Sequence, residues 1–321
     1  MTLNAPEVLF KNESNFPAIP VCDHYAGNEK FIRKGCELQD SLEIVFDITC
    51  DLEDGATAGK ETEHAELLCG LIQELSSPKR RLGIRVHDPE HQSFEDDLKI
   101  ALNEVGEKLC HLTIPKIRNL EQAKVALAAV SRFSQSAGLK QAPPIHFLIE
   151  THYAVAEAFQ IAALPGVRGL DFGLMDFVSA HSGAIPEEAM FSPAQFDHPL
   201  VRRAKLALSS AALAHGVVPC HSVTTDVVDP EQAYRDAYRA SREFGFLRMW
   251  SIHPAQIEPI TRAMTPSFEE IQKGRKILEA AEAADWGPIR YEDRLHDRAS
   301  YRFYWEMLKR AEASGVANTL T

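Results

Sequence analysis

Short apolar runs recur along the chain, and a longer amphipathic stretch separates each run from the next. Eight of these runs have the length and composition of β-strands. They occupy residues 16–21, 42–48, 81–86, 112–117, 145–150, 167–172, 216–223 and 246–252. Several are almost continuously apolar, which is typical of parallel strands that are covered on both faces. The pattern therefore predicts a sheet of eight parallel strands.

Helical periodicity fills the intervals between the strands. Residues 60–75, 120–138, 198–216 and 230–245 each repeat apolar side chains at helical spacing. The last three of these stretches end on a glycine, which is a common helix cap. Eight strands that alternate with helices favour a (β/α)8 TIM barrel, with a doubly wound sheet as the alternative. Neither a GxGxxG after the first strand nor a GxxxxGK[ST] occurs, which weakens nucleotide-binding interpretations.

The pattern changes near residue 265. An acidic, alanine-rich helix is predicted first, and a charged turn and a final helix with aromatic side chains follow it. This segment is too short for an independent core. We therefore expect a TIM-barrel catalytic domain over residues 1–264. Residues 265–321 are expected to form a C-terminal helical extension that packs on the barrel or on a neighbouring subunit.

The charge and cysteine content narrow the classes of function. The 321 residues carry a net charge of −12 and form no basic stripe, so nucleic acid and anionic membranes are not expected partners. No apolar run approaches the length of a membrane span, and the N-terminus lacks the features of a signal peptide. Six cysteines without a CxxC pair indicate reduced thiols and a cytoplasmic setting. An anionic substrate would need local cations, from arginine, lysine or a metal.

Ionisable residues gather at the C-terminal ends of the predicted strands. Three carboxylates follow the second strand, and single ionisable residues mark the ends of the others. They are Asp51, Glu53, Asp54, Arg85, Lys116, Glu150, Asp176, His221 and His253. In a barrel these ends share one face, where catalytic groups collect. The sequence therefore predicts a site on that face.

Glu150 and Asp176 are the candidate metal ligands. Carboxylates on adjacent strands suit Mg²⁺, which takes one or two of them together with waters and substrate oxygens. The alternatives are a solvated strand-end carboxylate for Glu150 and a helix cap or turn residue for Asp176. Asp171 either points into the site or caps the strand.

The candidate cations have two interpretations each. Arg85 lies in an apolar strand, so it should pair with a protein carboxylate such as Glu53 or Asp54, or with a substrate carboxylate. Lys116 is a Schiff-base lysine or a partly exposed structural lysine. His221 and His253 are bases or hydrogen-bonded spacers. No HExxH, His/Cys cluster or GxSxG indicates a zinc site or a hydrolase elbow.

Seven short motifs occur in one order along the chain: "CDLEDG", "IRV", "IPKI", "LIET", "DFGLMD", "IHPAQI" and "TPSFEEI". With them the chain resembles the HpcH/HpaI aldolase and citrate lyase superfamily, in the branch of citrate lyase beta subunits and malyl-CoA or citramalyl-CoA lyases. The resemblance runs from Phe16 to Lys309. It implies a TIM barrel with a C-terminal extension, assembled as a trimer or a dimer of trimers.

The resemblance also implies roles for individual residues. Glu150 and Asp176 would hold Mg²⁺, Arg85 would bind substrate, and Glu53 and Asp54 would line the site. Glu150 and Lys116 are further expected substrate contacts.

The resemblance also implies that one residue of the site comes from another subunit. The turn "EDRLHD" corresponds to the place where this family takes an aspartate from a neighbouring subunit, here Asp297. The alternative is that Asp297 only caps the last helix.

The expected function is that of a Mg²⁺-dependent carbon–carbon lyase. It would cleave or condense a 3-hydroxyacyl-CoA of the citryl-CoA or malyl-CoA type, with an acyl-CoA and a 2-oxo acid as the other partners. An acyl-CoA thioesterase on the same scaffold is one alternative. A non-catalytic, lyase-like binding subunit is the other.

Overall fold

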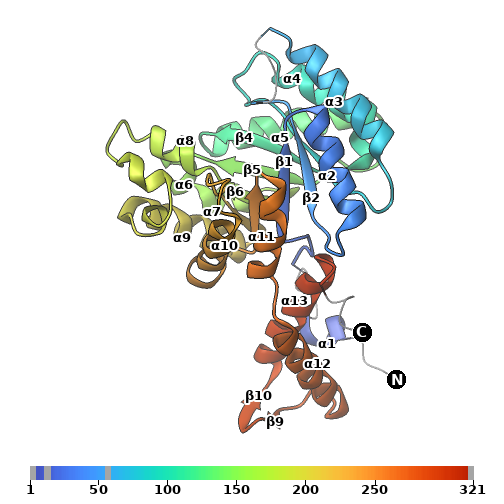
Figure 1. Ribbon diagram of the computed structural model, residues 1–321. Coiled ribbons are helices and arrows are strands. Elements are labelled where there is room, and N and C mark those ends of the chain that lie inside the picture. The colour runs from blue at the N-terminus through green and yellow to red at the C-terminus, as the bar shows by residue number, and fades with distance from the viewer. Residues whose placement is uncertain (1–4, 11–15, 55–58, 317–321) are drawn as a thin grey trace.

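A closed barrel of eight parallel strands forms the body of the protein (Figure 1). The computed structural model describes residues 5–10, 16–54 and 59–316. The strands are β1 (Cys22–Ala26), β2 (Asp47–Asp51), β3 (Leu82–Arg85), β4 (Leu109–Ile117), β5 (Ile145–Ile149), β6 (Val167–Phe172), β7 (Val218–His221) and β8 (Arg248–Ser251). They pair in sequence order, and β1 pairs with β8 to close the ring. The predicted TIM barrel is confirmed, and the doubly wound alternative is wrong.

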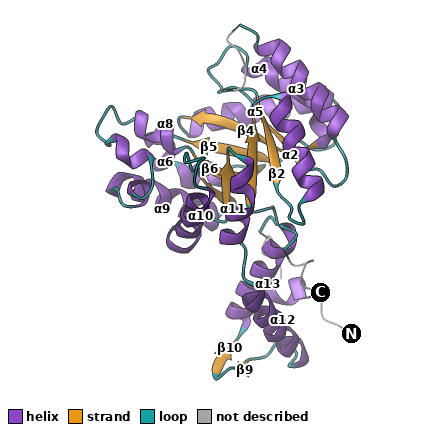
Figure 2. Cartoon of the chain, viewed as in Figure 1, coloured by secondary structure: helices purple, strands orange, loops and turns teal. Residues whose placement is uncertain are grey.

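Helices surround the barrel on its outside (Figure 2). They are α2 (Glu29–Ser41), α3 (Glu61–Leu75), α4 (Phe94–Val105), α5 (Leu120–Ser136), α6 (His152–Ala156), α7 (Ala158–Ala162), α8 (Leu174–Ser179), α9 (Pro199–Ala214), α10 (Pro230–Phe244) and α11 (Ile257–Met264). The four helices expected from periodicity appear as α3, α5, α9 and α10. Gly245 ends α10 with a φ of 74°, the left-handed conformation that glycine adopts without strain. No helix within the described ranges is long and apolar enough to cross a bilayer.

The first strand lies later in the chain than predicted. The apolar run at residues 16–21 precedes β1, and the strand itself has the sequence "CDHYA". Its Asp23 and His24 are almost completely buried. A strand with buried ionisable side chains escapes a search for apolar runs. The second strand is shifted in the same direction, from the predicted 42–48 to Asp47–Asp51.

A buried ion-pair cluster explains the polar character of β1. Arg248 is fully buried, and its guanidinium lies 2.9 Å from Asp23 and 2.7 Å from Asp47. It also donates a 2.6 Å hydrogen bond to the carbonyl of Pro20. TIM-barrel interiors are commonly filled by branched apolar side chains. Here charge pairing replaces part of that apolar filling, which is favourable only because each charge finds a partner.

Two inward-facing glycines make room for histidines inside the barrel. A Cβ on Gly83 would lie 2.6 Å from the ring of His111, and a Cβ on Gly169 would lie 2.6 Å from the ring of His146. The two imidazoles stack with their centroids 4.5 Å apart. The imidazole rings on β4 and β5 therefore fill the space that the glycines on β3 and β6 leave free.

The C-terminal extension projects from the barrel (Figure 1). It consists of α12 (Phe268–Ala283), β9 (Ile289–Tyr291), β10 (Arg294–His296) and α13 (Arg298–Ala313). A small apolar cluster joins it to the N-terminal helix α1 (Ala5–Phe10). Its buried members are Leu9, Phe10, Ile277, Ala281 and Tyr301.

Ser314 attaches the extension to the base of the barrel. Its carbonyl accepts a 2.9 Å hydrogen bond from the N–H of Val45, and its hydroxyl accepts one of 3.2 Å from the N–H of Val21. Val21 directly precedes the N-terminal end of β1, and Val45 lies two residues before that of β2. The extension is thus anchored at the end of the barrel opposite the C-terminal strand ends.

Candidate metal and substrate site

A pocket of about 400 Å³ opens at the C-terminal ends of the strands. It brings together five of the ionisable residues predicted at strand ends, from four different strands. These are Asp51, Asp54, Arg85, Glu150 and Asp176. Its remaining lining is largely apolar and aromatic, with Tyr25, Phe31, Leu174, Met175, Val223, Trp250 and Ile252. The pocket therefore has one charged side and one apolar side.

Glu150 is held in place by the backbone of β4. It is only 3% exposed, and its Oε2 accepts a 2.7 Å hydrogen bond from the N–H of Lys116. Lys116 has a φ of 54°, a left-handed conformation that is strained for a residue with a side chain. The β4–β5 register shifts at the same place, between Ile114 and Ile117. A local distortion of the strand thus aims one N–H at the carboxylate.

Gly173 leaves the space that Glu150 occupies. A Cβ built on this residue would lie 2.2 Å from Oε1 of Glu150. Gly173 is also the N-cap of α8, and Asp176 stands in the first turn of that helix. The interpretation of Asp176 as the helix cap is therefore wrong. Its exposed carboxylate faces the same pocket as Glu150.

The two carboxylates form a site with excess negative charge. Burial, followed by the charges of Asp176 and Glu53, raises the pKa of Glu150 to about 8. A bound cation would reverse this effect, since it favours the ionised form of both groups. Carboxylate oxygens are also the ligands that Mg²⁺ prefers. The residues present therefore fit a magnesium ion.

Arg85 stands beside this pair, within a ring of three carboxylates. It donates two hydrogen bonds of 2.7 Å to Asp51, in the parallel geometry of a bidentate pair. A third nitrogen lies 2.8 Å from Glu53, and Asp54 accepts a further bond of 2.8 Å. The guanidinium also lies 5.3 Å from the centre of the Tyr25 ring. All three carboxylates of the "DLED" segment thus converge on one arginine.

The three carboxylates differ in exposure. The side chains of Asp51 and Glu53 are 10% and 7% exposed, whereas that of Asp54 is 72% exposed. Releasing Asp54 into water costs far less than releasing a buried partner. An incoming carboxylate can therefore replace Asp54 while Asp51 and Glu53 continue to hold Arg85.

Lys116 and Glu53 support the site from outside the pocket. The ammonium of Lys116 lies 2.6 Å from Oε1 of Glu53. Although burial acts to lower the pKa of Lys116, the hydrogen bond and charge of Glu53 raise it. A Schiff-base lysine needs a neutral amine, so this environment disfavours that role. Neither side chain is among the described residues that line the pocket.

Three further candidates lie elsewhere. His221 is fully buried behind the strand, where its ring stacks on Phe196 at 5.3 Å. Asp171 is buried in the barrel interior, 3.7 Å from Nδ1 of His146. His253 caps the short 3₁₀ helix η4 (Pro254–Gln256) and lines a neighbouring pocket. The expectation that the histidines at the ends of strands seven and eight join the other groups is wrong for His221.

The neighbouring pocket has basic walls. It encloses about 570 Å³ and shares Tyr25, Phe31 and Ile252 with the first pocket. Lys30, Arg33, Lys34 and His253 also line it. Arg33 is paired with Glu29 and Glu74, and Lys34 lies 3.2 Å from Glu37. A long anionic ligand could extend from the first pocket past Lys30.

Asp297 is far from the pocket of its own chain. It caps α13, where its carboxylate accepts a 3.0 Å hydrogen bond from the N–H of Ala299. The 16 residues of α13 span about 24 Å. The other end of this helix adjoins Ser314, at the base of the barrel. Within one chain Asp297 is thus a helix cap, and a role in a neighbouring subunit stays a prediction.

Sequence reasoning missed several pocket residues. Asp51 was noted as part of the acidic cluster but not as the bidentate partner of Arg85. Tyr25 lies on β1, whose position was mispredicted. Trp250 belongs to β8, and only the inward parity of that strand identifies it as a wall residue. Once the bounds of β8 are known, the alternation of inward- and outward-facing side chains along that strand identifies Trp250.

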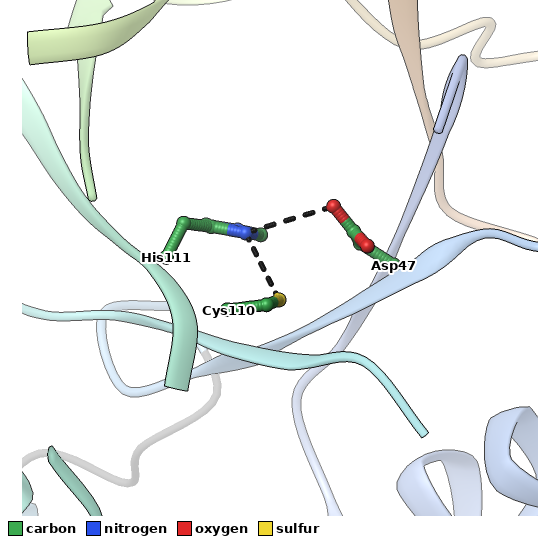
Figure 3. A group of neighbouring side chains, drawn as sticks. All are labelled: Asp47, Cys110 and His111. Carbon is green, nitrogen blue, oxygen red and sulfur yellow. Dashed lines mark hydrogen bonds and ion pairs between the residues drawn. The ribbon is translucent and has the colours of Figure 1, made fainter. Parts of the chain in front are cut away.

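A second group of metal-type side chains lies at the base of the barrel. Figure 3 shows Asp47, Cys110 and His111 pointing toward one another. Although burial acts to raise it, the pKa of Asp47 falls to about 2 beside Arg248 and Arg81. These guanidiniums already occupy both carboxylate oxygens. A metal cation there would face two positive charges, so the group is better explained as part of the buried ion-pair cluster.

Solved structures of related proteins share this architecture. A citrate lyase from Burkholderia xenovorans LB400 is 49% identical, with a TM-score of 0.82 over 98% of this chain and 96% of that one. CitE from Mycobacterium tuberculosis, in complex with magnesium, acetoacetate and coenzyme A, is 21% identical, with a TM-score of 0.67 over 92% and 99%. The second likeness shows the fold alone.

Two relatives named for malyl-CoA are more distant in sequence. An L-malyl-CoA/beta-methylmalyl-CoA lyase of Cereibacter sphaeroides is 25% identical over 83% of this chain and 87% of its own length. A (3S)-malyl-CoA thioesterase of the same species is 28% identical over 74% and 75%. The sequence profile of the HpcH/HpaI aldolase/citrate lyase family matches residues 42–254. The resemblance drawn from the motifs is thereby confirmed: the chain belongs to the HpcH/HpaI aldolase/citrate lyase family, a family of carbon–carbon lyases.

Proposed function

We propose that this protein is a Mg²⁺-dependent lyase that cleaves or forms the Cα–Cβ bond of a 3-hydroxyacyl-CoA thioester of the citryl-CoA or malyl-CoA type. The products of cleavage are an acyl-CoA and a 2-oxo acid. The observation that carries the proposal is the meeting of Glu150, Asp176 and Arg85 in one pocket. The lyase names of the relatives support the same class of reaction.

Glu150 and Asp176 are the proposed ligands of the magnesium ion. When bound, the ion supplies a Lewis acid that polarises the oxygen on the carbon undergoing cleavage. Glu150 is pre-positioned by the N–H of Lys116 and by the missing side chain of Gly173. Such preorganisation places the carboxylate without a rotamer search.

Arg85 is proposed to bind the carboxylate of the 2-oxo acid. Asp51 and Glu53 keep the guanidinium in one orientation, and the exposed Asp54 gives way to the substrate. The exchange conserves the charge balance, because one carboxylate replaces another. A guanidinium offers the planar, bidentate geometry that a carboxylate requires.

The thioester is proposed to extend along the apolar side of the pocket. Val223, Trp250 and Ile252 provide a surface for the acyl group. Coenzyme A is too long for this pocket, but the adjoining pocket with Lys30, Lys34 and His253 continues from the same wall. Its lysines suit the phosphates of coenzyme A.

Cleavage requires one base and one acid. The base accepts the hydroxyl proton of the substrate, the C–O bond becomes the carbonyl of the 2-oxo acid, and the electron pair of the broken Cα–Cβ bond passes to the thioester as an enolate. A proton then adds to Cα and yields the acyl-CoA. We assign this proton to Asp297, because the turn "EDRLHD" resembles the one from which this family takes an aspartate. Since Asp297 lies far from the pocket of its own chain, it would act in a neighbouring subunit. The working form is then a homo-oligomer, a trimer or hexamer, in the cytoplasm.

A condensation assay tests the proposal. The purified protein is incubated with Mg²⁺, glyoxylate or pyruvate, and acetyl-CoA or propionyl-CoA, and products are separated by mass. A new 3-hydroxyacyl-CoA that disappears when EDTA is added is the expected result. No product from any of these pairs and no turnover of malyl-CoA, with Mg²⁺ bound, would instead indicate a non-catalytic subunit.

A thioesterase is the second candidate. The relative named (3S)-malyl-CoA thioesterase favours it, since the two chains align over 74% of this one. In that case the same assay, started from malyl-CoA, would release free coenzyme A and malate. Glyoxylate and acetyl-CoA would not accumulate.

A further inference from the structure

Gln256 bridges two loops that border the pocket. It ends η4 and is 1% exposed. Its Oε1 accepts hydrogen bonds from the N–H groups of Ile252 and His253, at 3.1 and 3.3 Å. Its Nε2 donates to the carbonyls of Thr224 and Asp226, at 2.8 and 3.1 Å. One amide thus makes four hydrogen bonds, which uses both its donors and both its acceptor positions.

These hydrogen bonds continue the sheet beyond its end. Strands β7 and β8 pair as far as His221 and Met249. Residues 222–229 then form no regular structure, so the sheet no longer fixes the distance between the two chains. The Gln256 side chain restores a link at this point, from the loop after β8 to the loop after β7.

A second anchor holds the same loop from its other side. Asp236 on α10 is 1% exposed, and its carboxylate accepts a 2.7 Å hydrogen bond from the hydroxyl of Thr224. Thr224 is therefore held through its hydroxyl by Asp236 and through its carbonyl by Gln256. Gln256 therefore links the β8 loop to Thr224, whose own position α10 holds through Asp236.

The linked loops carry the apolar wall of the pocket. Ser222 and Val223 directly precede Thr224, and Ile252 is itself a partner of the amide. The proposed magnesium ligands and Arg85 lie on other strands, and none of these four hydrogen bonds of Gln256 reaches them. A change at Gln256 should therefore move the wall that faces the acyl group and leave the charged side in place.

From these contacts we infer that Gln256 is a positioning residue. It sets the distance between Val223 and Ile252 in the wall that faces the acyl group, and this distance selects the thioester that the pocket accepts. The inference rests on the proposed function, because it assigns this wall to the thioester. Glutamate at this position keeps the length but replaces two donors by an acceptor that faces two carbonyls. Asparagine keeps the amide but is one methylene too short for both loops.

Gln39 offers a matched control at the opposite end of the barrel. Its Nε2 donates to the carbonyls of Phe46 and Arg81, at 2.8 and 3.2 Å. The Gln39→Glu variant therefore loses the same kind of bonds, far from the pocket. It shares any general loss of stability with Gln256→Glu and not the specific effect on the wall.

The test measures condensation kinetics and ligand binding for wild type, Gln256→Glu, Gln256→Asn and Gln39→Glu. We expect both Gln256 variants to raise KM for the acyl-CoA about ten-fold, the effect of roughly one or two lost hydrogen bonds. The preference between acetyl-CoA and propionyl-CoA should change as well. The Kd values for Mg²⁺ and for pyruvate, measured by calorimetry, should stay within two-fold of wild type, and Gln39→Glu should keep the wild-type KM.

Three results would overturn the inference. An unchanged KM and acyl preference in both Gln256 variants would show that the wall does not depend on the amide. Equal effects in Gln39→Glu would reduce Gln256 to a general stabilising role. A wild-type protein that neither turns over nor binds an acyl-CoA would refute the proposed function first, and this inference with it.

Discussion

The backbone N–H of Lys116 donates a 2.7 Å hydrogen bond to Oε2 of Glu150. This contact joins β4 to the end of β5 through a residue whose φ is 54°. The strained backbone and the buried carboxylate are therefore parts of one arrangement. Strain of this kind persists where the surrounding structure compensates for it, and it is frequent at functional sites.

Substituting Gly173 by alanine should displace Glu150. The new Cβ would lie 2.2 Å from Oε1, so the carboxylate must leave its position. We expect Mg²⁺ affinity, measured by calorimetry, to fall at least ten-fold, as a ligand is lost or misplaced. The control is Gly70→Ala on α3, where no atom lies within 4 Å of the added methyl group. That variant should gain up to about 1 kcal/mol of stability and bind Mg²⁺ normally. Normal Mg²⁺ binding by Gly173→Ala would contradict the assignment of Glu150.

The stability of the metal-free protein should depend on pH through Glu150. Its pKa is about 8 in the folded state and 4.5 ordinarily. The folded state therefore holds this proton more tightly, and the stabilisation present below pH 4.5 is lost as the pH rises toward 8. The Tm of the apo protein, relative to Glu150→Gln, should fall across this range.

Magnesium should oppose this loss, because the ion binds the carboxylate form. The shift in Tm that saturating Mg²⁺ produces should thus grow from pH 5 to pH 8 in wild type. Glu150→Gln should show little shift at any pH. His87, whose pKa is also raised, remains in both proteins and cancels in the comparison. A wild-type shift that does not vary with pH would argue against Glu150 as a ligand.

Asp54→Asn should tighten the binding of 2-oxo acids. Asp54 competes for Arg85 through a 2.8 Å hydrogen bond and is the exposed member of the three carboxylates. Removing its charge leaves the guanidinium partly free, so the Kd for pyruvate in the presence of Mg²⁺ should fall several-fold. Asp40→Asn removes a surface partner of Arg80 and serves as the control. Weaker pyruvate binding by Asp54→Asn would show that Asp54 itself helps to hold the substrate.

Asp297→Asn and Glu150→Gln should complement each other if Asp297 acts between subunits. Each variant alone should be nearly inactive. Asparagine caps helices as well as aspartate does, so α13 should stay folded. After dissociation and reassembly at equal amounts, about a quarter of the sites would combine an intact pocket with an intact Asp297. Recovery of about that share of wild-type activity is expected, whereas an inactive mixture would exclude catalysis by a neighbour's Asp297.

The sequence predicted the barrel because seven of its eight strands overlap an apolar run that stands out from its surroundings. The exception, β1, carries Asp23 and His24, whose buried side chains pair with Arg248 and Ser251, more than 200 residues away. No local pattern contains that information. The charged side of the pocket was predictable for a related reason: Arg85, Glu150 and Asp176 interrupt or follow apolar runs, and strand ends converge in a barrel.

Other features depend on geometry that spacing does not encode. Because successive side chains of a strand point to opposite faces, His221 points out of the barrel and the next residue, Ser222, points toward the pocket. The positive φ of Lys116 and the role of Gly173 appear only once the strands are in register. The four hydrogen bonds of Gln256 follow from the loop paths after β7 and β8, although the "IHPAQI" motif contains the residue.

We propose that Glu150 and Asp176 hold one divalent cation beside Arg85. A crystal of the protein grown with Mn²⁺ in place of Mg²⁺ and soaked with oxaloacetate tests it most directly, since manganese is located by its anomalous scattering. We expect one anomalous peak within about 2.0–2.4 Å of an oxygen from each carboxylate, near the distances typical of such ions, with the acid's carboxylate hydrogen-bonded to the guanidinium. A peak elsewhere, or oxaloacetate bound away from Arg85, would contradict it.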